Sequence, residues 1–138
     1  METDTECLFC QIAAHKVSAN FVYEDGAVVA FLSIQPTRPG HTVVVPREHS
    51  SRLDLASAQV VANLFEVVRI LGSRVRKVMH ADGYNIGVNT GLAAGQLIEH
   101  THVHIIPRHT NDGLISWPHT NTTPEDLVRI AADIRAAL

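Results

Sequence analysis

Three histidines alternate with β-branched residues in the segment His100-Thr101-His102-Val103-His104. Side chains of a β-strand point to opposite faces in turn, so the pattern predicts a strand from Glu99 to Pro107 with all three imidazoles on one face. Successive imidazoles would then lie about 6.6 Å apart, at a rise of roughly 3.3 Å per residue. Three imidazoles at this spacing are too far apart to act on one atom, so the row suits a structural role at one end and a catalytic role at the other.

The chemistry of imidazole suggests a function for the three histidines. Neutral imidazole attacks phosphorus, leaves again readily, and exchanges protons near neutral pH. A neighbouring histidine can bond the phosphoryl oxygens or the leaving group. The alternatives are ordinary core histidines or a metal-binding patch, but three alternating histidines just after Gly95-Gln96 favour a chemical site.

Hydrophobic periodicity predicts the remaining elements. Apolar residues recur at helical spacing from about Ser57 to Val78, which predicts a long helix. Thr123 before Pro124 and two acidic residues is typical of a helix start, and that helix runs to the C-terminus. A short helix is expected from Cys7 to Ala14, and strands over 21–23, 27–32, 41–46 and 84–89.

These elements predict an α+β fold with an antiparallel sheet, a long central helix and a C-terminal helix. The Asp25-Gly26 pair between two apolar runs is a hairpin signal. The chain has 138 residues, of which 46% are hydrophobic, so we expect one domain spanning residues 1–138 with its own core.

Charge and hydropathy limit the partners. The net charge of −3 gives no broad attraction to nucleic acid or to an anionic membrane, so neither is an expected partner. No apolar stretch approaches the roughly 20 residues that cross a bilayer. The acidic start, Met1 to Glu6, lacks the pattern of a secretory signal, and we expect a cytoplasmic protein.

The histidine segment, continued by Ile105-Ile106, resembles the signature of the histidine triad (HIT) family, in which histidines alternate with apolar residues. Thr101 is less apolar than that pattern prefers. The similarity extends from about Cys7 to Arg108. It includes Gly95-Gln96, Asn89 at the end of the preceding strand, and a Pro-Gly-His strand in which His41 is expected to be a packing residue.

The resemblance implies an enzymatic mechanism. The central histidine, His102, would attack the α-phosphorus of a nucleotide and form a nucleotidyl-histidine that water then hydrolyses. His104, Asn89 and Gln96, which follows Gly95, would hold the phosphate oxygens. No metal is needed for this step. The implied substrates are purine nucleoside phosphoramidates or adenylated species, derivatives of AMP or GMP, and the implied assembly is a homodimer.

Two positions depart from the family pattern. Ser33 stands where relatives often carry an Asp or Asn that binds the ribose hydroxyls, so it is our candidate for the sugar contact. Leu97 replaces a serine that can donate to the leaving group. The candidates for an apolar base pocket, with ordinary core packing as the equal alternative, are Phe31, Leu32, Ile34, Phe9 and Ile12.

A second group of residues suggests a metal. Cys7 and Cys10 are two residues apart, a spacing shared by zinc sites, redox sites and buried thiol pairs. The βαβ pattern of a thioredoxin-like redox site is missing. Structural zinc needs four ligands, and His49 and His100 are natural partners. Prokaryotic HIT proteins with a Cys-x-x-Cys pair resemble this arrangement, so we expect a structural zinc ion.

Three other functions remain open from the sequence. A dinucleoside polyphosphate hydrolase or phosphorylase would use the same nucleophile on a different leaving group. A non-catalytic nucleotide-binding protein could retain the fold, although the intact His102 and Gly95-Gln96 argue against it. A zinc-only interaction module would lose its fold on chelation and bind no nucleotide.

Overall fold

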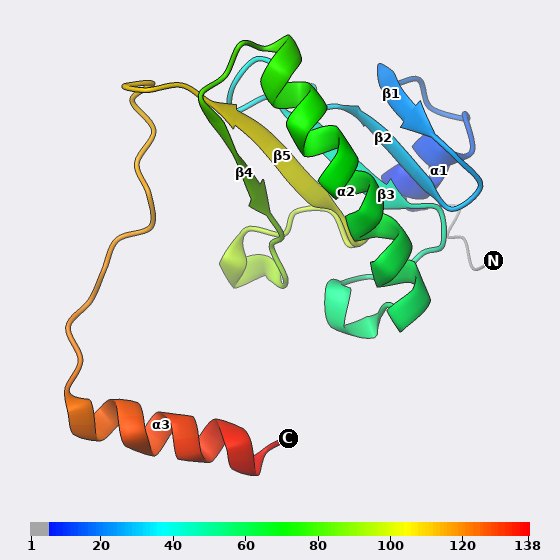
Figure 1. Ribbon diagram of the computed structural model, residues 1–138. Helices are drawn as coiled ribbons and strands as arrows, with labels where there is room; N and C mark the ends of the chain where they lie inside the picture. Colours follow the sequence, from blue (N-terminus) through cyan, green and yellow to red (C-terminus); the bar gives the residue numbers. More distant parts are fainter. Residues whose placement is uncertain (1–5) are drawn as a thin grey trace.

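The computed structural model describes residues 6–138 and contains three α-helices and five strands (Figure 1). The acidic start that suggested a protein without a secretory signal lies, apart from Glu6, outside the described residues. The elements, in chain order, are α1 (Leu8–Ala13), β1 (Phe21–Glu24), β2 (Val28–Leu32), β3 (Thr42–Pro46), α2 (Ala58–Val78), β4 (Gly83–Gly87), β5 (Val103–Arg108) and α3 (Pro124–Ala136), with short 3-10 turns at Leu53–Leu55 and Leu92–Ala94.

The five strands form one antiparallel sheet in the order β1-β2-β3-β5-β4. The predicted α+β class is therefore confirmed. The β3–β5 contact places the histidine strand near the middle of the sheet, next to the strand that carries Val43 and Val44.

Helix starts follow the sequence signals. The hydroxyl of Ser57 accepts a hydrogen bond from the backbone N–H of Val60, and that of Thr123 accepts one from Asp126. Each bond satisfies a backbone donor that the first turn of a helix leaves unpaired. The starts predicted for the long helix and the C-terminal helix are confirmed.

The histidine strand begins later than predicted. β5 starts at Val103, so His100 and His102 belong to the segment that leads into it. The cause is Thr101, whose backbone N–H donates to the carbonyl of Ser50 at 2.8 Å instead of to a neighbouring strand. β4 likewise ends at Gly87, two residues before the predicted end at Asn89.

The two faces of the sheet carry different cores. α2 covers one face, where its apolar side packs against Val28 and Ala30 of β2, Val44 of β3, and Val103 and Ile105 of β5. α1 covers part of the other face. The core there consists of Phe9, Ile12, Ala13, Val29, Phe31, Val43 and Val45. The histidines point to this second face, because Phe9 packs against the rings of both His100 and His102.

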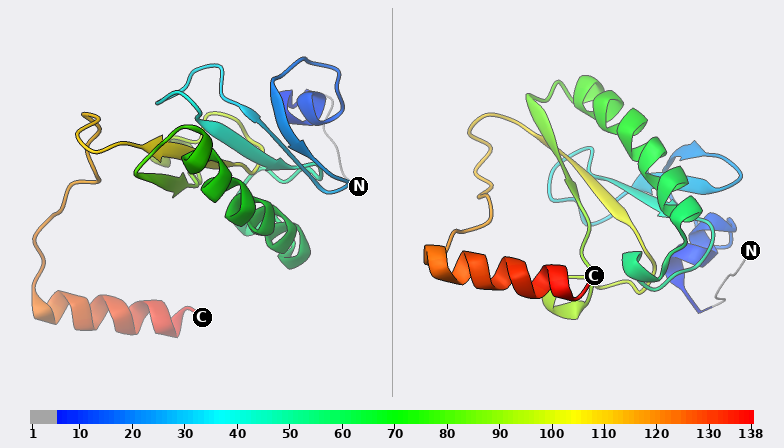
Figure 2. Two further views of the ribbon diagram at one scale, coloured as in Figure 1. Left: turned by 45° about the horizontal axis from the view of Figure 1, so that its top comes forward. Right: turned by 60° about the horizontal axis from the view of Figure 1, so that its bottom comes forward.

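The C-terminal segment extends away from this body. After β5 the chain runs outward as an extended arm, and α3 lies apart from the sheet (Figure 1 and the left view of Figure 2). None of the α3 residues is buried. Among the described residues, no helix combines the length and the apolar character that a membrane crossing requires.

Candidate active site

Hydrogen bonds fix the orientation of the His102 ring. Its Nδ1 lies 2.6 Å from the carbonyl oxygen of His100. A carbonyl only accepts, so Nδ1 carries the proton and donates it, which leaves the lone pair on Nε2. The ring is 6% exposed and packs edge-on to Phe9, with centroids 5.1 Å apart. His102 is therefore a neutral imidazole with a free nucleophilic nitrogen and a fixed orientation.

His104 has the complementary tautomer. The backbone N–H of Thr37 donates to Nδ1 of His41 at 3.0 Å, so the proton of neutral His41 is on Nε2. That Nε2 lies 2.8 Å from Nδ1 of His104 and donates to it. The proton of neutral His104 is consequently on Nε2, where it can be donated to a phosphoryl oxygen. The centroids of the His102 and His104 rings are 4.9 Å apart.

His41 is a functional residue that the sequence interpretation missed. It was expected to be a packing residue, and it is buried, but its ring also determines which nitrogen of His104 donates. No local sequence signal indicates this role, because the contact depends on the pairing of β3 with β5.

We expect His41→Phe, which keeps a ring in the same space, to lower kcat about tenfold with little change in KM. The reason is that His104 would lose the donor that fixes its tautomer. Steady-state kinetics at several pH values will measure the effect. His119→Phe, at an exposed position, is the matched control. An unchanged kcat in His41→Phe would show that His104 needs no such partner.

Burial keeps these rings neutral. It lowers the pKa of His104 to about 4, assisted by repulsion from His102 and His41. Burial also lowers the pKa of His102, although its hydrogen bond to His100 opposes the shift. Both imidazoles consequently remain uncharged at neutral pH, which is the form that a nucleophile and a neutral hydrogen-bond donor require.

The position of Asn89 relative to His102 stays a prediction. β4 and β5 pair Gly83 with Arg108 and Gly87 with His104, where the pairing ends. A continuation of this register by two residues would set Asn89 opposite His102 and on the same face. Gly95 closes the arrangement: its φ is +97°, and a Cβ there would lie 3.3 Å from the Asn89 amide nitrogen. Glycine therefore allows the loop backbone to approach Asn89 closely.

Gln96 holds the same loop. Its carbonyl oxygen accepts from the backbone N–H of Gly91 at 2.9 Å, and its amide nitrogen donates to the carbonyls of Ser51 and Ile98. The side chain is 7% exposed. Its observed role is to fix the loop, and a direct phosphate contact stays a prediction that would require it to exchange a partner.

The residues suggested for sugar and base recognition divide between the two faces. Phe31 and Phe9 pack together on the histidine face, with centroids 5.5 Å apart. Leu32 was also suggested for the base pocket, which is wrong. It lies on the opposite face and lines a groove with α2, because neighbouring strand residues point in opposite directions. The Ser33 hydroxyl accepts from the backbone N–H of Gln35, and its sugar contact stays a prediction.

The four residues predicted to bind zinc lie together. Their ligand atoms are all within 4.8 Å of one another. The two Nδ1 atoms of His49 and His100 are 3.2 Å apart, and the distances from Cys sulfur to His nitrogen are 3.3, 3.4 and 3.5 Å. Ligands at the usual zinc distances occupy tetrahedron corners about 3.3 Å apart for two nitrogens and about 3.5 Å for nitrogen and sulfur. The cluster fits a tetrahedral metal ion.

The tautomer of His100 also suits a metal. Its Nε2 lies 2.7 Å from the carbonyl oxygen of Pro46 and must donate to it. This leaves the lone pair of Nδ1 directed into the cluster, in the arrangement common for metal-binding histidines. Cys7 and Cys10 are both free thiols in the structure. His100 therefore faces the cluster of Cys and His side chains, while its backbone carbonyl orients the His102 ring.

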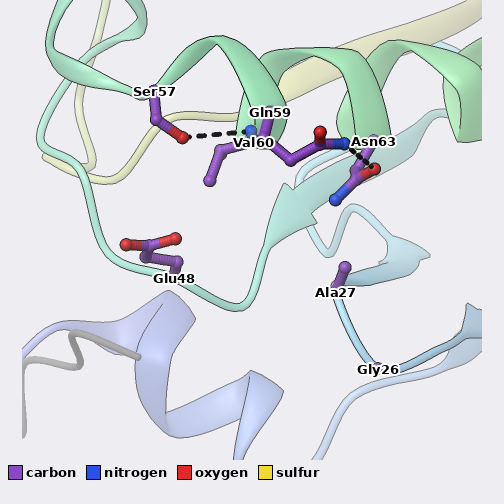
Figure 3. Close-up of a pocket in the computed structure, with 7 residues that line it drawn as sticks. All are labelled: Gly26, Ala27, Glu48, Ser57, Gln59, Val60 and Asn63. Carbon is purple, nitrogen blue, oxygen red and sulfur yellow. Dashed lines mark hydrogen bonds between the residues drawn. The ribbon is translucent and has the colours of Figure 1, made fainter.

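Two surface hollows differ in their suitability for a nucleotide. A cleft of about 650 Å³ borders the Gly91–Gln96 loop and is lined by Ser51, Arg52, Leu55, Gly91, Leu92, Gln96, Leu97 and Glu99. A smaller hollow of about 230 Å³ lies at the start of α2 (Figure 3). Its one charged lining residue is Glu48, and its Ser57, Gln59 and Asn63 side chains bond within α2. A carboxylate without a cation disfavours phosphate there.

Comparison with known proteins identifies relatives of this chain. The HIT domain family matches residues 14–111. An uncharacterised HIT-like protein of Methanocaldococcus jannaschii is 44% identical over 107 residues, which is 78% of this chain and 82% of its own. An adenosine 5′-monophosphoramidase of Schizosaccharomyces pombe is 31% identical over 96% of this chain and 98% of its own. An adenylylsulfatase of Arabidopsis thaliana is 36% identical over 79% of this chain and 55% of its own.

Solved structures share the fold. A protein of Streptococcus mutans UA159 is 34% identical and superposes with a TM-score of 0.92 over 98% of this chain and 87% of its own. A zinc-bound histidine triad family protein from Mycobacterium smegmatis is also 34% identical, with a TM-score of 0.75 over 96% of this chain and 97% of its own.

Proposed function

This chain belongs to the HIT domain family, and on that basis we propose that it is a nucleotide hydrolase or transferase. It acts at the α-phosphorus of purine nucleoside phosphoramidates or related adenylated species. The observation that carries the proposal is the free Nε2 of His102, opposite an Nδ1 that donates to His100. The names of the Schizosaccharomyces pombe and Arabidopsis thaliana relatives support hydrolysis of adenosine 5′-phosphoryl compounds.

The proposed reaction has two steps. In the first, Nε2 of His102 forms a bond to the α-phosphorus while the bond from phosphorus to the amine or acyl oxygen breaks. An amine leaving group takes up a proton from water, whereas a carboxylate leaves as the anion. In the second, water attacks the nucleotidyl-histidine, releases the nucleoside monophosphate and restores neutral His102. The Nε2–H of His104 and the amide of Asn89 would stabilise the phosphoryl oxygens in both steps.

The metal cluster has a structural role in this proposal, with zinc as the ion. Cys7, Cys10, His49 and His100 would hold it, and their donor set is that of a closed structural site. The zinc-bound relative from Mycobacterium smegmatis supports the choice of metal. We also propose a homodimer.

A turnover panel will test the proposed activity. It compares adenosine and guanosine 5′-phosphoramidates with adenylyl sulfate and with dinucleoside polyphosphates. We expect kcat/KM for an adenosine phosphoramidate to exceed that for diadenosine tetraphosphate at least about tenfold, in line with the activity named for the Schizosaccharomyces pombe relative. Efficient polyphosphate cleavage with negligible phosphoramidase activity would favour the dinucleoside polyphosphate hydrolase instead. Nucleotide binding without turnover of any compound would indicate a binding protein.

A further inference from the structure

The peptide group that joins His100 to Thr101 is held on both of its sides. Its carbonyl oxygen lies 2.6 Å from Nδ1 of His102, and its N–H donates to the carbonyl oxygen of Ser50 at 2.8 Å. The group is planar, so its carbonyl and its N–H cannot turn independently. Whatever fixes the N–H side therefore also fixes the carbonyl that orients the His102 ring.

The Thr101 side chain adds two hydrogen bonds to the contact with Ser50. Its Oγ1 lies 3.1 Å from the carbonyl oxygen of Ser50 and 2.8 Å from the Ser50 Oγ. A carbonyl only accepts, so the Thr101 hydroxyl donates to it and accepts from the Ser50 hydroxyl. The N–H and the hydroxyl of Thr101 thus converge on one oxygen atom. A single N–H···O bond permits rotation about its own axis, and the second bond opposes that rotation.

The sheet itself does not hold this peptide group. The pairing of β3 with β5 ends at Val44 and Val103, and β3 ends at Pro46, which has no backbone N–H to donate. Thr101 is 1% exposed, so water does not take the place of a strand partner. An apolar residue at this position, which the histidine triad pattern prefers, would keep only the N–H bond. The hydroxyl is therefore an addition that this chain makes to the pattern.

Ser50 is a firm anchor because both of its neighbours in the chain are held. Nδ1 of His49 lies 3.2 Å from Nδ1 of His100 in the proposed metal site. The carbonyl oxygen of Ser51 accepts a hydrogen bond from the side-chain amide of Gln96 at 2.6 Å. A shift of this short segment would break contacts at the proposed metal site or at the loop that precedes the histidines.

We propose that Thr101 is a positioning residue for the reaction, and that its hydroxyl acts on His102 through the His100 carbonyl. The hydrogen bonds of a neutral imidazole decide which of its nitrogens carries the proton. By preventing the peptide group from turning, the hydroxyl keeps the proton of His102 on Nδ1 and the lone pair on Nε2. This inference deepens the proposed function and rests on it, because a fixed Nε2 matters for catalysis only if His102 is the nucleophile.

Two reciprocal substitutions in the full-length, zinc-saturated protein will test the proposal. Thr101→Val keeps the branched shape and removes the hydroxyl, whereas Thr101→Ser keeps the hydroxyl and removes the buried methyl group. NMR of ¹⁵N-histidine-labelled protein at mildly alkaline pH shows which ring nitrogen carries the proton, and His102→Asn identifies the signals of His102. We expect Thr101→Val to convert the single Nδ1–H form of His102 into a mixture of tautomers. It should also lower kcat about tenfold, with KM changed less than about twofold.

A role of Thr101 in stability alone predicts a different result. Thr101→Ser should lower Tm by a few degrees through the lost methyl group, yet keep the single Nδ1–H form of His102. Thr42→Val is the matched control, because Thr42 is 0% exposed and its hydroxyl also donates to a carbonyl, that of Gly40, at 2.9 Å. This control should lower Tm without changing the tautomer of His102.

Three results would overturn the proposal. They are an unchanged tautomer in Thr101→Val, the same mixture of tautomers in Thr101→Ser and Thr42→Val, or a changed tautomer in Thr101→Val with an unchanged kcat. The NMR comparison uses no substrate, so it is separate from the turnover panel. If the original protein turns over no compound of the panel, the proposed function fails, and the tautomers still show whether Thr101 orients the ring.

Discussion

Replacing His102 with asparagine is expected to lower kcat/KM for an adenosine phosphoramidate on the order of 10⁴-fold, because the proposed nucleophile is removed and nothing replaces it. Asparagine suits this test. Its amide N–H can replace the Nδ1–H of His102 as the donor to the carbonyl oxygen of His100, so this buried carbonyl keeps a hydrogen bond. Stopped-flow or chromatographic assays of nucleoside monophosphate release will measure the loss.

The controls separate chemistry from folding. Thermal unfolding of His102→Asn should stay within a few degrees of the original protein, since the lost contact with Phe9 is one aromatic pair worth about 1 kcal/mol. Mass spectrometry of the original enzyme, quenched at alkaline pH during turnover, should detect a nucleotidyl group on His102. Unchanged turnover in His102→Asn would refute the nucleophile assignment.

Much of the fold could be predicted from local signals. The long helix and the C-terminal helix begin where Ser57 and Thr123 cap them, because capping depends only on residues within one turn. The start of the histidine strand was placed too early for a non-local reason. Thr101 pairs with Ser50, 51 residues away, and no periodicity reveals such a partner.

The candidate site was predictable to a similar degree. The alternation of the histidines and the Cys-x-x-Cys spacing were enough to group the residues that the structure brings together. The role of His41 was not predictable, since it depends on the register that pairs β3 with β5 and brings two rings 63 residues apart into contact. The face assigned to Leu32 was wrong for a local reason. Neighbouring residues of a strand point to opposite faces, so Leu32 cannot share the face of Phe31.

The hydrogen bonds of His100, His102 and His104 indicate a different role for each of the three histidines. His100 uses Nε2 for Pro46 and Nδ1 for the metal cluster, and its carbonyl receives the proton of His102. His104 is set by His41 at the other end. The segment from His100 to His104 therefore connects the proposed metal site to the proposed active site, and a change at the metal site would reach the proposed nucleophile, His102, through a single backbone carbonyl.

Loss of the metal is expected to lower the stability of the protein strongly. A ligand present at a thousand times its Kd stabilises the folded state by about 4 kcal/mol, so chelation should lower Tm on the order of 10 °C. Elemental analysis should find one zinc ion per chain before chelation. Cys10→Ser should reproduce the lower Tm without chelator, whereas His80→Ser, at an exposed histidine outside the cluster, should not.

The loss should begin at α1. Cys7 is the N-cap of α1 and Cys10 lies in its first turn, so both ligands hold the start of this helix, and a six-residue helix has little stability of its own. The core between α2 and the sheet contains none of the four ligands, so it should persist. Hydrogen exchange should therefore accelerate in α1 on chelation while α2 stays protected. Because Phe9 on α1 packs against His102, the same chelation should weaken nucleotide binding. An unchanged Tm and unchanged exchange in α1, with no stoichiometric metal, would show that the four residues form only a buried thiol and imidazole cluster.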